Sequence, residues 1–122
     1  MNLQRELNLQ VKGNTYKVEF PTVGKFLDIE STKIKVSRNE YGGFIQSLTR
    51  NSLKALDFVD MISYFSVLVP NLLKDLKSDS YLDLDVMDAN ELLTVYKENF
   101  NPWIESWLKV LRGDEKKENK DE

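Results

Sequence analysis

The chain of 122 residues contains no cysteine and no histidine. Without cysteine it can form no disulfide, no thiolate nucleophile and no zinc-thiolate site. Without histidine it lacks the usual general base at neutral pH and the commonest ligand of transition metals, which excludes Ser-His-Asp and Cys-His chemistry together. We therefore expect a protein that is not an enzyme and that uses no cofactor.

The chain also lacks an excess of one charge sign and a long apolar run. Seventeen basic and twenty acidic residues give a net charge of -3, and the basic residues do not cluster. Such a surface does not attract phosphate backbones, so no nucleic acid is expected as a partner. The most apolar stretch, 61–73, is interrupted by Ser63, Ser66 and Pro70, and the N-terminus lacks the apolar core of a signal peptide. We expect a cytoplasmic protein without a membrane partner.

The apolar residues that are present suffice for one folded unit. Hydrophobic residues make up 41% of the chain and charged residues 30%, as in ordinary globular proteins. The length fits a single domain, which we place at 1–113. The last nine residues, 114–122, contain no apolar side chain and are predicted to form a disordered charged tail.

The N-terminal residues predict a β-hairpin over 7–20. Apolar and polar residues alternate along 7–11 and along 16–20, as in half-buried strands. A two-residue loop at Gly13 and Asn14 would close the hairpin. This register places three apolar pairs on one face: Val11 with Tyr16, Leu9 with Val18 and Leu7 with Phe20.

A two-stranded ribbon is marginal alone, so its apolar face must be buried on the rest of the chain. We expect that cover to come from the following helices, with Val23, Phe26 and Leu27 nearest. Both outer edges of the hairpin would stay open, which permits strand addition by a partner or a second copy.

Helical spacing of apolar residues fills the remainder of the chain. The predicted helices lie at about 22–32, 44–69, 71–76, 89–100 and 102–112. Thr22 and Asp88 are candidate caps, Asn101 and Pro102 suit a new helix start, and Gly113 suits a helix end. We expect the last two helices to form an antiparallel pair. The predicted fold class is α+β, an N-terminal β-hairpin packed on a bundle of four to five α-helices.

For two segments, 33–36 and 44–69, the sequence allows two structures each, and a loop is predicted between them. The stretch 33–36 fits either the end of the first helix or a short extended piece. The segment 39–43 is predicted to be a loop. The long helix 44–69 fits either one piece or two pieces that meet near Asn51.

A group of carboxylates raises the alternative of a carboxylate-based metal-dependent enzyme at Asp83, Asp85 and Asp88. A calcium loop counted from Asp83 needs glycine at its sixth position and glutamate at its twelfth, where this chain has Asp88 and Thr94. Acids that precede a helix and interact with its dipole explain the group without a metal. No metal site is predicted.

Aromatic residues form 11% of the chain, and such residues are enriched at the centres of protein interfaces. The apolar residues of 44–69 cover more than one stripe, so this helix is either central or half covered by a partner. A packed core explains the aromatic content equally well. If a protein partner or a second copy binds, the expected contacts are Phe58, Ile62, Phe65, Trp103 and Trp107.

The hairpin and the helix after it also carry a resemblance. Val11, Gly13, Tyr16 and Val18 form the pattern V-x-G-x-x-Y-x-V, and a proline, a threonine and the sequence FLDIE at 26–30 follow. Over about 7–112 this order of elements resembles the small tail assembly chaperones of long-tailed bacteriophages. The resemblance implies a non-enzymatic cytoplasmic helper that binds the tape measure protein and helps to recruit tail tube subunits. An alternative is a virion component, such as a tail completion or connector protein.

Overall fold

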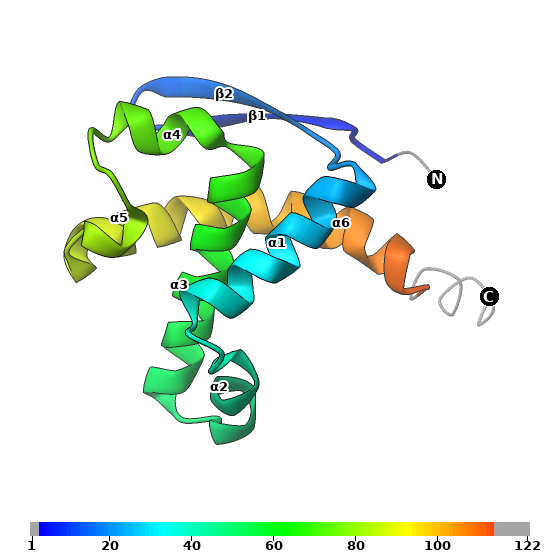
Figure 1. Cartoon of the computed structure of the whole chain (residues 1–122). Coiled ribbons are helices and arrows are strands. Elements are labelled where there is room, and N and C mark those ends of the chain that lie inside the picture. The colour runs from blue at the N-terminus through cyan, green and yellow to red at the C-terminus, as the bar shows by residue number, and fades with distance from the viewer. Residues whose placement is uncertain (1–2, 114–122) are drawn as a thin grey trace.

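An N-terminal hairpin followed by helices forms the architecture of the chain, confirming the α+β class (Figure 1). The structure is a computed structural model that describes residues 3–113, so the predicted tail lies outside the described residues. The elements are β1 (Glu6–Val11), β2 (Asn14–Glu19), α1 (Val23–Val36), α2 (Tyr41–Ser47), α3 (Arg50–Leu68), α4 (Pro70–Asp75), a 3-10 turn (Tyr81–Asp83), α5 (Val86–Val95), a π-helical turn (Tyr96–Phe100) and α6 (Asn101–Arg112).

The hairpin exists, but its predicted register is wrong. Leu7 pairs with Val18 and Leu9 with Tyr16, so the turn residues are Lys12 and Gly13. Both have positive φ, 49° and 85°, the combination that a tight primed turn requires and that glycine adopts without strain. The shift moves each pairing by two positions, so the apolar residues still share one face.

The buried face of the hairpin is covered mainly by α4 and α6, which lie beneath it in Figure 1. The ring of Phe20 lies 5.7 Å from Trp103 and 6.4 Å from Trp107. The Tyr16 hydroxyl donates a 2.6 Å hydrogen bond to the Asp75 carboxylate at the end of α4. The expectation that Val23 and Leu27 cover the hairpin is wrong, because those side chains are exposed.

Helix α1 begins where expected and is longer than expected. The Thr22 hydroxyl accepts a hydrogen bond from the backbone N–H of Lys25, as a capping residue does. The undecided stretch 33–36 is the end of this helix.

The predicted loop at 39–43 is wrong from Tyr41 onward, because α2 begins there. This short helix has no buried residue, so its own packing explains little of its stability. The Tyr41 hydroxyl donates a 2.7 Å hydrogen bond to Asp60 on α3. This tertiary contact offsets the low helix propensity of Gly42 and Gly43.

Two helices, α2 and α3, occupy the region predicted as 44–69. Leu48 has a left-handed backbone, φ 55°, and Thr49 caps α3 by accepting a hydrogen bond from the N–H of Ser52. The two-piece alternative is therefore confirmed, with the break just before Asn51. Helix α3 is central, and its buried residues are Val59, Met61, Ile62, Ser63, Tyr64, Phe65 and Leu68.

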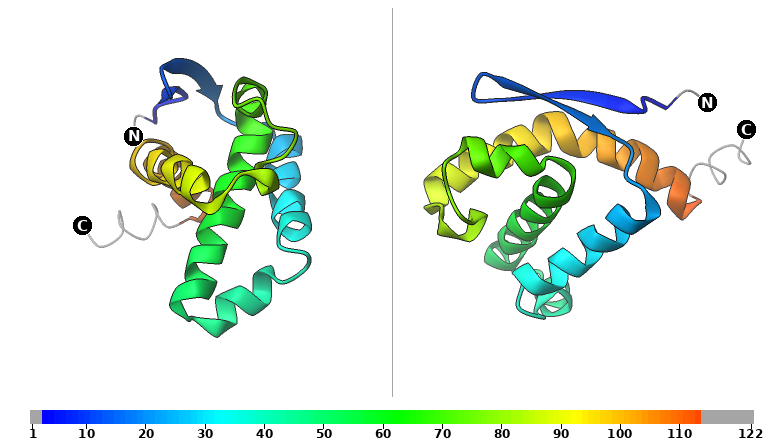
Figure 2. Two further views of the ribbon diagram at one scale, coloured as in Figure 1. Left: turned by 90° about the vertical axis from the view of Figure 1, so that its left-hand side faces the viewer. Right: turned by 45° about the horizontal axis from the view of Figure 1, so that its top comes forward.

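The expected antiparallel pair of C-terminal helices is wrong. Helices α5 and α6 form one continuous curved helix joined by the π-helical turn, as the right-hand view of Figure 2 shows. Pro102 removes a backbone donor, and the wider turn before it accommodates that loss while the helix continues. The cap of α5 is Asp85 rather than Asp88; its carboxylate accepts from the Asp88 N–H at 2.8 Å. Gly113 ends α6 with φ 79°, as predicted.

Aromatic rings join α3 to this curved helix. Phe65, fully buried on α3, stacks on Phe100 with centroids 5.4 Å apart and lies edge-on to Tyr96 at 5.9 Å. Trp103 also stacks on Phe100, with ring centroids 6.1 Å apart. Rings in these arrangements add to the stability that burial alone provides. Phe65 is thus the centre of the contact between the two longest helical segments.

We predict that Phe65→Ala lowers the free energy of unfolding by about 3–5 kcal/mol, because it removes a fully buried ring and leaves a cavity. The control is Leu82→Ala, at a side chain that is 57% exposed, where the expected change is within about 0.5 kcal/mol. Urea unfolding followed by circular dichroism measures both. Equal effects of the two substitutions would contradict the assignment of Phe65 to the core.

Candidate partner-binding groove

The five side chains expected to contact a partner lie largely inside the fold. Phe65 is fully buried, Ile62 is 8% exposed, and Trp103 and Trp107 are each 5% exposed. Phe58 is partly buried, with the Lys54 ammonium 5.8 Å from its ring centre. These residues therefore hold the core together, and their contact with a partner stays a prediction.

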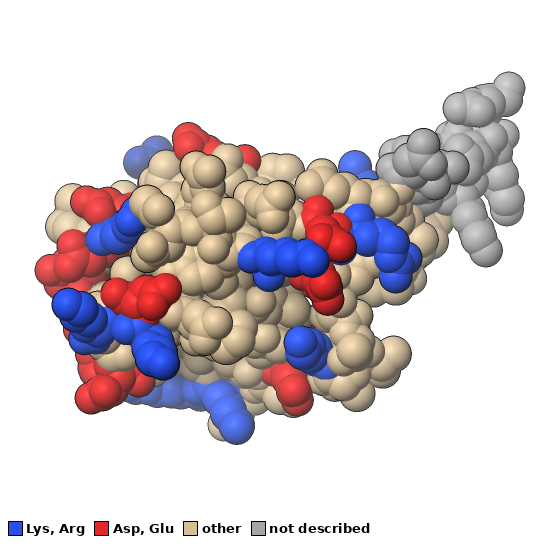
Figure 3. Space-filling model, turned by 90° about the horizontal axis from the view of Figure 1, so that it is seen from above, with Lys and Arg blue, Asp and Glu red and all other residues tan. Residues whose placement is uncertain are grey.

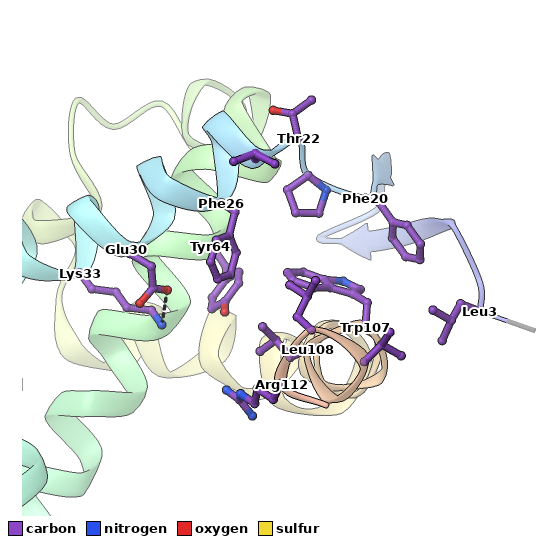
Figure 4. A pocket seen from close by; sticks show the side chains of 14 residues that line it. Leu3, Phe20, Thr22, Phe26, Glu30, Lys33, Tyr64, Trp107, Leu108 and Arg112 are labelled. Carbon is purple, nitrogen blue, oxygen red and sulfur yellow. Dashed lines mark ion pairs between the residues drawn. The ribbon is translucent and has the colours of Figure 1, made fainter. Parts of the chain in front are cut away.

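An apolar groove of about 670 Å³ opens between α1 and the C-terminal half of α6 (Figure 4). The end of the hairpin closes one side, and α3 contributes the floor. This volume lies within the range of about 300–1,000 Å³ that is usual for ligand sites. The lining residues are Leu3, Phe20, Pro21, Thr22, Val23, Phe26, Glu30, Lys33, Tyr64, Trp107, Leu108, Val110, Leu111 and Arg112.

The walls of the groove are mainly aromatic and aliphatic. Phe26 on α1 meets Trp107 on α6 edge-on, with ring centroids 6.5 Å apart, and both rings line the groove. Above this contact the rim is exposed: Val23 is 78% and Leu111 63% accessible to solvent. Val23 is the first residue of α1, and Leu111 lies in the last turn of α6. The groove therefore presents apolar surface that the other residues of 3–113 leave exposed.

The inner end of the groove is polar. The Lys33 ammonium lies 2.9 Å from the Glu30 carboxylate and 4.0 Å from that of Asp60. It also faces the rings of Tyr41 and Tyr64, at 5.7 and 5.3 Å from their centres. The Lys33 side chain is only 13% exposed, whereas that of Glu30 is 47% exposed. Of these two charges, that of Glu30 is therefore the more accessible.

Tyr64 brings a polar atom to the groove floor. The residue is 3% exposed, and its hydroxyl points into the space between α1 and α6 (Figure 4). The buried side-chain atoms that lack a hydrogen-bond partner within residues 3–113 are the Tyr81 hydroxyl and Trp107 Nε1, and of these two residues Trp107 lines the groove. Burial, and then the charges of Glu30 and Asp60, raise the pKa of Tyr64, so the hydroxyl stays protonated at neutral pH.

Asp83, Asp85 and Asp88, the carboxylates considered above as metal ligands, do not form a metal site in the described part of the chain. Asp85 is the cap of α5 and accepts a backbone hydrogen bond. Over 3–113 no three side chains of the metal-binding types come together.

Two smaller sets of exposed apolar side chains lie away from the groove. One set is at the start of α5 and consists of Leu82, Val86 and Met87, and the other is near α2 and consists of Ile45, Leu48 and Leu53. Neither set lines the groove. Charged side chains of both signs are interspersed on the face seen from above the hairpin (Figure 3).

None of the described helices is long and apolar enough to cross a membrane. No protein-family model, curated protein or solved structure matches the chain. The function must therefore be argued from the chemistry of the groove and from the order of elements.

The groove was not predicted from the sequence, although the apolar positions of α1 carry one sign of uncovered surface. Val23, Leu27 and Ile34 lie on one face of α1 at spacings of four and seven residues, and all three are more than half exposed, although only Val23 lines the groove. Phe26 and Ile29 supply the face that packs inward. Helix α1 thus has apolar residues on a second face besides the one that packs inward. Such a second apolar face indicates an uncovered surface.

We predict that the fold becomes unstable at alkaline pH because of its buried tyrosines. Burial raises the pKa of Tyr64, Tyr81 and Tyr96 above the ordinary value of 10.0. The unfolded chain therefore loses these protons first as the pH rises. The stabilising contribution is complete below pH 10 and is lost progressively above it.

The measurement is an alkaline titration followed by tyrosinate absorbance and by circular dichroism together. Tyrosinate from the buried residues is expected to appear only with the loss of helical signal. Ionisation of all five tyrosines near pH 10 with the helices intact would contradict the burial described above.

Proposed function

We propose that this chain is a non-enzymatic protein-binding helper that holds an apolar helical segment of another protein in the groove between α1 and α6. The observation that supports the proposal is the combination of an aromatic floor with an exposed apolar rim at Val23 and Leu111. An amphipathic helix laid in an apolar groove is a recurrent mode of recognition. The proposed role needs no catalytic group.

The resemblance to phage tail assembly chaperones gives this proposal a specific form. A chaperone of that kind binds the tape measure protein and helps to recruit tail tube subunits in the cytoplasm of the infected cell. The groove supports such a role, because covering the apolar stripe of a helical client keeps the client from associating with itself. The client proposed here is accordingly a tape measure protein encoded beside this chain.

We predict that Val23→Glu weakens co-purification with that tape measure protein at least about tenfold, because a carboxylate would be buried in an apolar contact without a partner. Val86→Glu is the matched control. Val23 and Val86 are each the first residue of a helix, α1 and α5, and are 78% and 70% exposed. Glutamate at a helix start suits the dipole in both cases, so folding is preserved.

Co-expression with the tape measure protein, followed by affinity purification and quantification of the pair, measures the effect. An equal loss of co-purification with Val23→Glu and Val86→Glu would place the binding surface outside the groove. No association with the wild-type chain, or no tail genes beside its gene, would overturn the chaperone role. Stoichiometric presence of the chain in purified particles would support a virion component instead.

A further inference from the structure

We infer that the groove selects a partner helix with a glutamate among its apolar side chains, whose carboxylate accepts a hydrogen bond from the indole N–H of Trp107 and is attracted by the charge of Arg112. The inference rests on the proposed function, because it names the chemistry of the segment that the groove would hold. Three features of the groove carry it: an unused donor, an excess of donors over acceptors, and the sign of the net charge.

The first feature is the indole N–H of Trp107. This residue lines the groove, and its nitrogen is buried without a hydrogen-bond partner among residues 3–113. An indole nitrogen can only donate, and a buried donor without an acceptor is costly. The other tryptophan shows the satisfied state, because Trp103 Nε1 donates a 2.7 Å hydrogen bond to the carbonyl oxygen of Gln4. An occupant that brings an acceptor to Trp107 would supply the missing bond.

The place of this N–H determines where the acceptor enters. In Figure 4 the nitrogen lies at the end of the indole nearer Phe20. The Phe20 ring also lines the groove, lies 6.4 Å from the ring of Trp107 between centroids, and is only partly buried. A small displacement of the Phe20 ring therefore opens a path from the groove to the nitrogen.

The second feature is the excess of donors on the walls of the groove. Among the described residues that line it, Glu30 is the one carboxylate, and it is already paired with Lys33 at 2.9 Å. Arg112 lies 3.5 Å from Glu105, which is longer than a good N–H···O hydrogen bond. A guanidinium has five N–H donors, so this one long contact leaves donors of Arg112 for an occupant.

The third feature is the sign of the charge. The charged side chains that line the groove are Glu30, Lys33 and Arg112, so the lining carries one net positive charge. Glu30 and Lys33 neutralise each other, and the partner of Arg112, Glu105, does not line the groove. A carboxylate complements the remaining charge, whereas an ammonium would be repelled by it. An acidic side chain is therefore favoured as the polar group of the occupant.

The test uses three designed helical peptides that differ at one position. Each has leucines one turn before and one turn after a central residue, which is glutamate, glutamine or norleucine. Glutamine keeps an acceptor without the charge, and norleucine removes both. Binding to the full chain is measured by fluorescence anisotropy of the labelled peptide. We expect the glutamine peptide to bind about fivefold more tightly than the norleucine peptide, as for one neutral hydrogen bond. The glutamate peptide is expected to bind about threefold more tightly again, as for a partly exposed ion pair.

Two variants assign the preference for charge to Arg112. Arg112→Gln is expected to remove the advantage of the glutamate peptide over the glutamine peptide, while the affinity for the norleucine peptide is unchanged. Lys109→Gln is the matched control, because Lys109 lies in the same last turn of α6 but does not line the groove. Both residues are exposed, so the fold tolerates both substitutions.

The hydrogen bond of Trp107 is observed by NMR of the isotope-labelled chain, whose two tryptophans give two indole N–H signals. The signal of Trp107 is assigned through the contact of its ring with Phe26. Trp103, already bonded to Gln4, is the internal control. We expect the Trp107 signal to lie further downfield in the glutamate and glutamine complexes than in the norleucine complex, because a hydrogen bond forms only with the first two.

Each other outcome overturns a distinct part of the argument. Equal affinity for the three peptides, a glutamate preference that survives Arg112→Gln, or a Trp107 signal that is the same in all three complexes overturns the inference and leaves the proposed function intact. Failure of all three peptides to bind overturns both. Self-association of the chain that Val23→Glu abolishes would place a second copy in the groove and would also overturn the inference.

Discussion

The packing of Phe65 on Phe100 is the contact on which the rest of the structure depends. It holds the central helix α3 against the curved helix of α5 and α6, with ring centroids 5.4 Å apart. Every other buried element packs on one of these two segments. Because interiors are close-packed, the position of this contact fixes where α1 can approach α6 and where it cannot. The groove lies between these two helices (Figure 4).

Helix α3 contributes to both the core and the groove, so the packing of the core also determines the shape of the groove. Phe65 and Tyr64 are neighbours on α3, so their side chains point about 100° apart. The first fills the core, while the second carries its hydroxyl to the groove floor. On the other side, Trp107 packs against Phe20 of the hairpin and also forms a groove wall. Residues that stabilise the fold thus also shape the surface that a partner would meet.

Predictions from the sequence were correct where a helix start or end depends on only a few neighbouring residues. Thr22 caps α1 and Gly113 ends α6 because capping needs only the adjacent backbone. Predictions from local sequence failed where contacts between residues far apart in the chain determine the structure. Asn101 and Pro102 have the pattern of a new helix start, yet the apolar spacing continues from Phe100 to Trp103 without a break. A π-helical turn joins the two segments, and the chain continues as one helix.

The sequence by itself determined the α+β class, the alternating face of the hairpin and the positions of most helices. These follow from apolar periodicity and turn chemistry, which act over short stretches of chain. Only the tertiary structure decided which apolar residues are buried. Phe65 and Trp107 enter the core, whereas Val23 and Leu111, equally apolar, line an open rim. The reason is geometric: helices of fixed length that meet at an angle can cover each other only near their crossing point.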